Sequence, residues 1–197
     1  KKKKIDCTLY VSNFNYRTKK QKKLKNFFYE TDTYNNTKIV RLYTTKFYFN
    51  SFDRIFSYVF FFFNSLFYFF FFEKKKFNFI IGESVPPLIA LSAFFCSLKN
   101  KSKFIYQIRD MWPIQLYYQG SLKKNSLIFL ILEFINKFLI NRSIFIISVL
   151  PNLKDYLKAK YNYNKEVYYL PNGIDISSIK KKIKNKKINF KKDYTSI

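Results

Sequence analysis

The feature that most constrains the fold is the alternation of apolar, strand-like runs with helical segments over the second half of the chain. Four short runs rich in aromatic and β-branched residues are separated by three longer segments with helical patterning. The predicted strands cover residues 77–81, 104–108, 144–148 and 167–170, and the predicted helices cover residues 86–98, 126–141 and 152–161. Strict alternation with apolar strands is typical of a parallel sheet. We therefore predict an α/β fold, a Rossmann-like parallel sheet with helices on both faces.

The first half of the chain adds two predicted strands and one long apolar segment. Residues 5–12 and 38–43 read as strands, whereas residues 13–36 are polar, basic and irregular. Residues 52–72 are almost wholly apolar. We expect the two early strands and the four later ones to form a single sheet.

The helix predicted over residues 126–141 carries two local signals. Ser126 stands just before the apolar run and is the predicted N-cap, because serine accepts a hydrogen bond from a free amide at a helix start. Glu133 stands four residues before Lys137, the spacing at which opposite charges pair on one helix face.

The phenylalanine-rich segment has three possible interpretations. Residues 55–72 carry no charge over 18 residues, which meets the minimal length for a membrane span, and Lys74, Lys75 and Lys76 follow as a cytoplasmic flank would. A span would place the predicted strands before and after it on opposite sides of the bilayer. We therefore favour a buried or half-buried helix of the domain over a helix that dips into the membrane interface, and both over a membrane-anchored protein that uses the segment as a span.

The formal net charge of +25 predicts an anionic partner without naming it. Phe, Tyr, Lys, Asn and Ile have A/T-rich codons, so a biased genome accounts for part of the excess. Basic runs at residues 19–25 and 180–192 would favour an anionic membrane surface or simply remain solvated. A basic nucleic-acid-binding module would interleave exposed aromatics with basic residues, whereas the aromatics here lie in apolar segments. We expect no nucleic acid partner.

Several chemistries are excluded by composition. The chain has no histidine, which removes histidine-based zinc sites and Ser-His-Asp catalysis. Its two cysteines, Cys7 and Cys96, have neither metal-ligand spacing nor a disulfide framework. A reducing, cytoplasmic location without a metal site fits this composition.

Polar residues follow the predicted strands at the point where each strand ends. Glu83 and Ser84 follow the first strand, Arg109 and Asp110 follow the second, and Pro-Asn-Gly at residues 171–173 follows the fourth. In open α/β sheets, ligands bind at the carboxyl ends of the strands. These residues are therefore the candidate site.

The order and spacing of four segments resemble the N-terminal domain of family 4 glycosyltransferases, and most closely the bacterial branch that builds lipopolysaccharide and capsule sugars. The segments are FIIGESVPPLIAL (79–91), FIYQIRDMWPIQLYYQG (104–120), LEFINKFLINRSIFIISVLPNLKDYL (132–157) and VYYLPNGID (167–175). The resemblance implies one half of a GT-B fold. Residues 1–176 would be the acceptor-side domain, and residues 177–197 a basic linker towards a C-terminal nucleotide-sugar-binding domain.

The resemblance also implies an activity. The intact enzyme would transfer a sugar from a nucleotide-sugar donor to a lipid-linked or polysaccharide acceptor in cell-envelope glycan synthesis, with no metal or other cofactor. It would work in the cytoplasm, peripherally at the inner face of the cell membrane. The family's first strand would precede Lys1 and its donor-binding glutamates would follow Ile197, so we expect the 197 residues alone to transfer no sugar.

The resemblance assigns roles to seven residues. Asp110 would be catalytic, and the residues that bind acceptor or phosphate would be Glu83, Ser84, Arg109, Trp112, Asn172 and Gly173.

Each of these residues also has a purely structural interpretation, which for Glu83 and Ser84 is a simple turn from strand to helix. Asp110 would cap a short following helix, Arg109 would form a salt bridge to Asp110 or Glu83, and Trp112 would anchor its loop by packing. Asn172 and Gly173 would form a tight turn that needs a positive φ.

Overall fold

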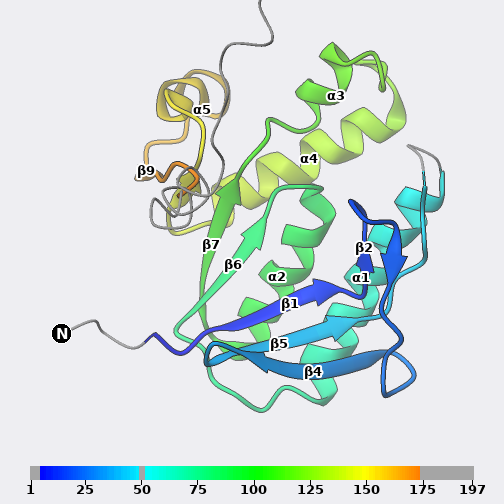
Figure 1. Ribbon diagram of the computed structural model, residues 1–197. Coiled ribbons are helices and arrows are strands. Elements are labelled where there is room, and N and C mark those ends of the chain that lie inside the picture. Colours follow the sequence, from blue (N-terminus) through cyan, green and yellow to red (C-terminus); the bar gives the residue numbers. More distant parts are fainter. Residues whose placement is uncertain (1–4, 49–51, 174–197) are drawn as a thin grey trace, which may run out of the picture.

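The predicted parallel sheet is present in the computed structural model, which describes residues 5–48 and 52–173 (Figure 1). Its strands β6 (Phe79–Glu83), β7 (Lys103–Ile108), β8 (Ile146–Ser148) and β9 (Val167–Tyr169) are parallel and lie in that order. The connecting helices are α2 (Pro87–Asn100), α3 (Ile114–Tyr118), α4 (Leu127–Arg142) and α5 (Leu153–Tyr161). The α/β, Rossmann-like class predicted from the alternation is confirmed.

The prediction of helices on both faces of the sheet is wrong for the described residues. Side chains of α2, α4 and α5 form one core with Phe104, Tyr106 and Ile108, which alternate along β7 and so share one face. On the opposite face, Phe79 and Ile81 are about half exposed. The strands follow one another in sequence order, and right-handed crossovers that advance in one direction place every helix on the same face.

The prediction of a single sheet is also wrong. Strands β1 (Thr8–Ser12) and β5 (Thr37–Leu42) form as predicted and pair in parallel, but with β4 (Tyr29–Tyr34) they make a separate sheet in the order β1-β5-β4. Strands β2 (Phe14–Asn15) and β3 (Lys20–Gln21) form a small antiparallel pair. The segment 13–36, predicted to be irregular, therefore holds three strands.

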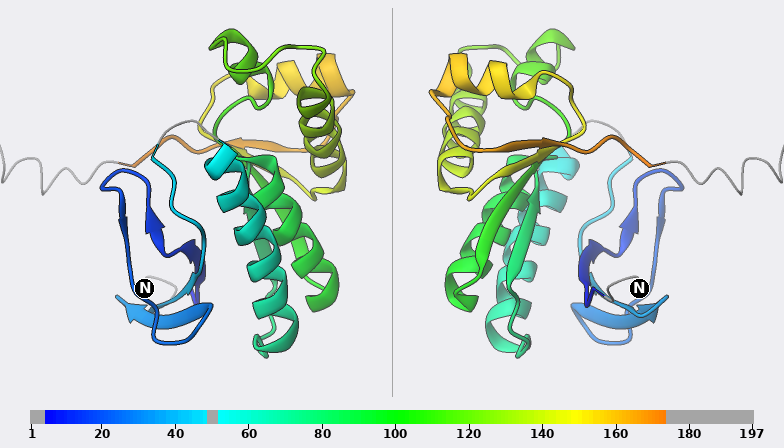
Figure 2. Two further views of the ribbon diagram at one scale, coloured as in Figure 1. Left: turned by 90° about the vertical axis from the view of Figure 1, so that its right-hand side faces the viewer. Right: turned by 90° about the vertical axis from the view of Figure 1, so that its left-hand side faces the viewer.

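Helix α1 (Phe52–Phe71) joins the two sheets and packs along α2. Phe61 and Tyr68 of α1 form a core cluster with Val40 and Leu42 of β5, and Ile89 of α2 packs against it. Figure 2 shows α1 and α2 side by side, with the first sheet beside them. The segment Asp53–Phe71 is long and apolar enough to cross a membrane, and 28% of its apolar window is buried. This burial on one side fits the half-buried interpretation.

A buried carboxylate fastens the end of α1 to the first sheet. Glu73 accepts hydrogen bonds from the Tyr10 hydroxyl at 2.8 Å, from the Lys38 ammonium at 3.2 Å and from the backbone N–H of Lys75 at 3.0 Å. Burial opposes ionisation of this carboxyl, but the three hydrogen bonds outweigh it and hold the pKa of Glu73 below its ordinary value. The carboxylate therefore links α1 to both β1 and β5.

The two local signals in α4 have different outcomes. The Ser126 side chain accepts a hydrogen bond from the Phe129 N–H at 3.3 Å, so the predicted N-cap is confirmed. The predicted pair of Glu133 with Lys137 is wrong, because Glu133 instead binds Lys160 at 2.7 Å and the Tyr161 hydroxyl at 2.9 Å. A partner from α5 has displaced the neighbour on the same helix.

Gly82 marks the closest approach of β6 to α2, and replacing it tests that packing. A Cβ at position 82 would lie 2.9 Å from the Ala90 Cα, a backbone atom that cannot move aside alone. We expect Gly82→Ala to lower the free energy of unfolding by about 1–3 kcal/mol, measured by urea denaturation. Gly173→Ala is the control, because nothing lies within 4 Å of its Cβ. Equal stability of the two variants would contradict the close packing.

Candidate functional site

The candidate site lies where β6 and β7 end at the same edge of the parallel sheet. Glu83 is the last residue of β6 and is paired in register with Gln107 of β7. Ser84 follows β6, and Arg109 and Asp110 follow β7 directly. Four of the seven predicted site residues are therefore neighbours at the carboxyl edge, where open α/β sheets bind ligands.

Ser84 ties the two loops together. Its side chain is buried, and its hydroxyl accepts a hydrogen bond from the Arg109 N–H at 3.1 Å and donates one to the Asp110 carbonyl at 3.5 Å. Its own N–H donates to the Gln107 carbonyl at 2.9 Å. All three bonds hold backbone, so this serine positions the loop that carries Arg109 and Asp110, and its hydroxyl is already occupied.

Arg109 and Glu83 form an ion pair on the solvent side of this junction. The Arg109 Nη1 and the Glu83 Oε1 are 2.7 Å apart, and the two side chains are 47% and 45% exposed. The salt bridge to Glu83 that sequence reasoning offered as an alternative is therefore present. Because the pair is half exposed, it adds little stability, and a ligand can reach the other guanidinium nitrogens.

Asp110 has a different status from Arg109. Its backbone carbonyl accepts the Ser84 hydroxyl and the Trp112 N–H, but its carboxylate makes no hydrogen bond or ion pair within the described part of the chain. Helix α3 begins beyond Pro113 without a side-chain cap, so the N-cap interpretation of Asp110 is wrong. A half-buried carboxylate without a structural partner remains available as a hydrogen-bond acceptor or a base.

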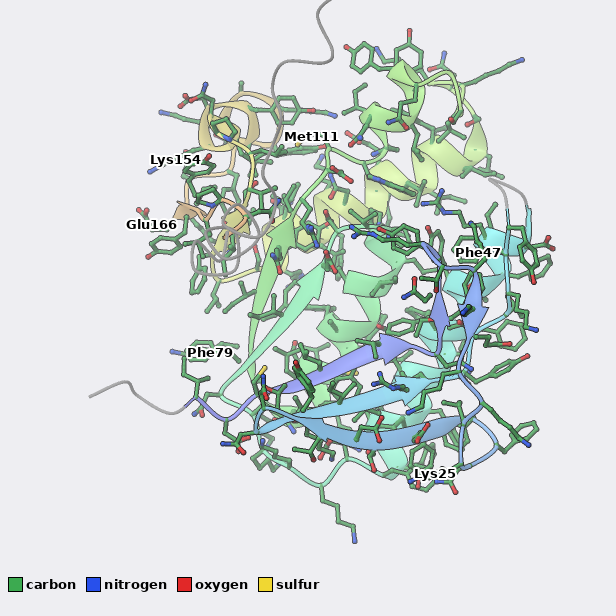
Figure 3. All side chains as sticks on the ribbon, in the orientation of Figure 1. Lys25, Phe47, Phe79, Met111, Lys154 and Glu166 are labelled. Carbon is green, nitrogen blue, oxygen red and sulfur yellow. The ribbon has the colours of Figure 1, made fainter. Side chains whose placement is uncertain are left out.

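Met111 and Trp112 differ in their contact with the main core cluster. Met111 packs against the main core cluster, whereas Trp112 is half-buried and is not part of that cluster. Figure 3 places Met111 beyond the end of β7, between the sheet and the helices. The indole is therefore free of the core, on the same loop as Asp110.

Asn172 and Gly173 stand apart from the other candidates. They follow β9, which lies two strands from β7, and strands are about 4.8 Å apart. Both are exposed, and Gly173 does not have the positive φ that the predicted turn requires. They share the edge with Asp110 but do not contact it through any hydrogen bond in the described chain.

Ser148 is a positioning residue that sequence reasoning missed. It is fully buried at the end of β8, where its hydroxyl donates to the Ile108 carbonyl at 2.9 Å and accepts from the Leu150 N–H at 3.0 Å. Ser84 makes the same kind of bond beside the neighbouring strand. Ser84 and Ser148 each stand at the end of an apolar strand, and this position is the sequence signal that would have identified their role.

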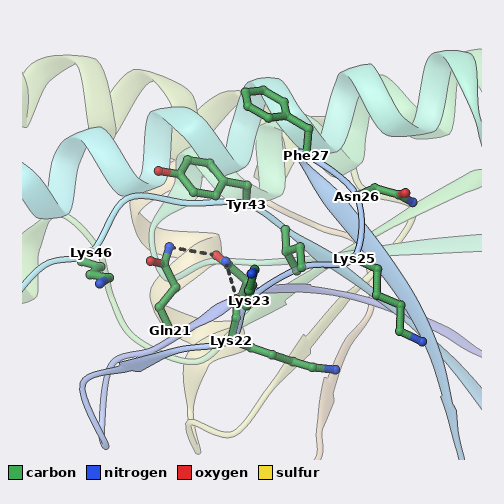
Figure 4. Close-up of a pocket in the computed structure, with 10 residues that line it drawn as sticks. Gln21, Lys22, Lys23, Lys25, Asn26, Phe27, Tyr43 and Lys46 are labelled. Atoms are coloured by element: carbon green, nitrogen blue, oxygen red, sulfur yellow. Dashed lines mark hydrogen bonds between the residues drawn. The ribbon is translucent and has the colours of Figure 1, made fainter.

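A polar hollow lies beside β3, away from the candidate site, and is open and basic (Figure 4). It has a volume of about 520 Å³, and Lys22, Lys23, Lys25 and Lys46 line it. Lys22 is already paired with Glu30 at 3.2 Å and Asp32 at 2.8 Å. The Asn13 amide at its wall is used internally, accepting from Gln21 and donating to the Lys22 carbonyl. Much of the predicted basic run 19–25 is thus solvated or structurally paired.

Comparisons with protein-family models and with curated proteins find no match for this chain. Residues 5–48 and 52–173 contain no group of three acidic or cysteine side chains that could hold a metal ion. The assignment of a function therefore depends on the geometry at the carboxyl edge and on the segments quoted above.

Substitutions of Ser84 and Glu83 distinguish a buried polar group that holds the loop from an exposed one that does not. Ser84→Ala leaves the Arg109 N–H without its acceptor, and we expect it to lower the free energy of unfolding by about 1–3 kcal/mol. Glu83→Gln removes only a half-exposed ion pair and should cost less than about 1 kcal/mol. Urea denaturation measures both. A cost for Glu83→Gln as large as that for Ser84→Ala would mean that the ion pair holds the loop.

Proposed function

We propose that this chain is the acceptor-side domain of a GT-B glycosyltransferase that transfers a sugar from a nucleotide-sugar to a lipid-linked or polysaccharide acceptor. The observation that carries the proposal is the Asp110 carboxylate, which has no partner among residues 5–48 and 52–173 and stands beside Arg109 at the carboxyl edge of a parallel sheet. The family resemblance of residues 79–175 supports the reaction class.

In the proposed reaction, each group at the edge has one task. Asp110 accepts the proton of the attacking acceptor hydroxyl. Arg109 forms parallel hydrogen bonds to a phosphate of the acceptor, and Glu83 orients the Arg109 guanidinium. Trp112 offers an apolar platform for a sugar ring. Asn172 and Gly173, two strands away, bind a more distant part of the acceptor. Positive groups that neutralise the donor phosphates would assist departure of the leaving group.

We further propose that the domain works at an anionic membrane surface in the cytoplasm. The outer side of α1 exposes Phe56, Phe60 and Phe63, and Leu127 and Phe134 of α4 are exposed as well. Three lysines at positions 74–76 follow α1, and the chain as a whole carries +25. Exposed aromatics together with a high positive charge suit insertion into the headgroup region of anionic lipids.

Binding of a soluble acceptor analogue, farnesyl diphospho-N-acetylglucosamine, tests the acceptor site by calorimetry. Arg109→Gln and Asp110→Asn each remove a charged hydrogen-bond partner, worth about 1.5–3 kcal/mol, so we expect Kd to rise about 10- to 100-fold. The control is Asp6→Asn, an exposed carboxylate that precedes β1 of the other sheet. Absence of binding by the unmodified chain, or equal binding by all variants, contradicts the proposal.

Sedimentation with vesicles of phosphatidylglycerol and phosphatidylcholine tests the membrane surface. We expect the double variant Phe56→Ser, Phe63→Ser to lower the partition coefficient about tenfold or more, because two exposed rings no longer insert. The matched control is Phe27→Ser with Tyr34→Ser, which removes two exposed rings outside the helices. Equal losses in both pairs argue against a specific face, and retention after carbonate washing would indicate a span.

A further inference from the structure

One stretch in the first half of the chain is strongly basic and carries no acidic residue. Residues 14–27 hold six positive side chains: Arg17, Lys19, Lys20, Lys22, Lys23 and Lys25. This stretch forms β2, β3 and the segment that follows them, and its second part lines the open hollow of about 520 Å³ beside β3. Lys46, which follows β5, lines the same hollow. Two separate parts of the sequence therefore bring positive charge to one place.

Most of the positive charge in this hollow is not neutralised by the protein. Lys22 is paired with both Glu30 and Asp32 of β4. Lys25 also lowers the pKa of Asp32 through space, but it does so from beyond ion-pair distance. Three lysines of the hollow are exposed and form no ion pair within residues 5–48 and 52–173: Lys23, Lys25 and Lys46. These three charges are available to an anionic ligand.

Two exposed aromatic rings stand among these lysines. Phe27 is 98% exposed and Tyr43 is 38% exposed, and both line the hollow. The Tyr43 ring contacts the Phe60 ring of α1 at a centroid distance of 6.2 Å, so the helix supports it from one side. Each ring offers a flat apolar face on which another ring can stack.

A buried asparagine holds the two sides of the hollow together. The Asn13 Oδ1 accepts hydrogen bonds from the Thr44 N–H at 3.0 Å and from the Gln21 amide at 3.4 Å. The Asn13 Nδ2 donates to the Lys22 carbonyl at 3.0 Å, and the Gln21 amide also donates to the Thr44 carbonyl at 2.7 Å. The segments after β3 and after β5 are therefore fixed to one another, which limits the entropy that is lost when a ligand binds.

The three unpaired lysines are spread along the hollow. In Figure 4, Lys46 and Lys25 lie at opposite ends and Lys23 lies between them. The rings of Tyr43 and Phe27 lie along the same stretch. One compact anion would reach a single end of this row, whereas a chain with regularly spaced charges would reach all of it. Cations that alternate with rings match a chain whose phosphates alternate with flat bases.

We propose that this hollow binds a single-stranded nucleic acid of any sequence, with phosphates on Lys23, Lys25 and Lys46 and bases stacked on Phe27 and Tyr43. Lysine suits this task, because its ammonium binds phosphate as a point charge and imposes no fixed orientation. Stacking serves every base, since every base has a flat face.

The sequence-based expectation of no nucleic acid partner came from the position of the aromatics in apolar segments. Phe27 lies instead in the basic stretch 14–27, and Tyr43 is the exposed last residue of an apolar run. None of the candidate residues at the carboxyl edge of the parallel sheet lines this hollow. Nucleic acid binding here is therefore independent of the proposed sugar transfer.

Binding of fluorescein-labelled oligothymidylate of about ten nucleotides, measured by fluorescence anisotropy against salt concentration, tests the lysines. Each phosphate bound on a single strand adds about 0.7 to the dependence of log affinity on log salt. We therefore expect the triple variant Lys23→Gln, Lys25→Gln, Lys46→Gln to make this slope shallower by about 2. The matched control Lys123→Gln, Lys124→Gln, Lys158→Gln removes three exposed positive charges outside the hollow and should leave the slope unchanged.

Phe27→Ala tests the stacking in the same assay. We expect Kd to rise about 5- to 100-fold at fixed salt, because one stacked base is lost, while the salt slope stays the same. The Phe27 ring is almost fully exposed, so its removal leaves the fold unchanged. Tyr118→Ala, on α3 and 79% exposed, is the control and should bind as the unmodified chain does.

Five results would overturn the proposal. Absence of binding by the unmodified chain is the first. An equal change of slope in the two triple variants would mean that only net charge attracts the strand. A duplex of the same length that binds as tightly as the single strand would mean that no base stacks on the rings. Stronger competition by polygalacturonate than by unlabelled oligothymidylate would assign the hollow to an acidic glycan. Loss of binding to phosphatidylglycerol vesicles in the Lys23, Lys25 and Lys46 variant, with oligothymidylate binding retained, would assign it to lipid headgroups.

Discussion

The packing of α1 against α2 is the constraint on which the rest of the molecule depends. The two sheets share no hydrogen bond between β1 and β6, so this helix layer is what holds them in one body. Ile89 of α2 reaches the core beneath the first sheet, while the absence of a side chain at Gly82 lets α2 lie directly on the second. The buried Glu73 carboxylate adds a polar link between the end of α1 and the first sheet.

At the carboxyl edge, polar groups that hold backbone are separate from polar groups that face solvent. Ser84 and Ser148 are buried, and their hydroxyls form hydrogen bonds with backbone carbonyls and amides of neighbouring segments. Asp110 and Arg109 stand on the loop that these serines fix, and their charged ends are left accessible. Rigid support with accessible charged groups is what a binding edge needs, because little ordering entropy is then lost when a ligand arrives.

Most helices and strands could be predicted from the sequence, but their arrangement into two separate sheets could not. The strands and helices after residue 77 were recognisable because each run is apolar over its whole length. Strand β4 was missed because its sequence, YETDTY, is polar, and the charges that neutralise Glu30 and Asp32 come from Lys22 and from Arg41 of β5. Local periodicity does not record such partners. Local periodicity also does not show which strands pair with one another. The helices lie on one face of the parallel sheet because of its strand order, which the periodicity does not contain either.

The position of the candidate site could be predicted from where the strands end, whereas the pairing of its side chains could not. That Glu83, Ser84, Arg109 and Asp110 cluster follows from parallel topology, whereas the choice of Glu83 over Asp110 as partner of Arg109 depends on side-chain reach. Among the described residues, β1 and β6 are outer strands of their sheets, and such open edges have a consequence for handling the protein. Such edges invite pairing between molecules, and mutual repulsion from a charge of +25 opposes it. Colloidal stability should therefore fall as ionic strength rises, since added salt screens the repulsion but leaves the backbone groups of the edges unchanged.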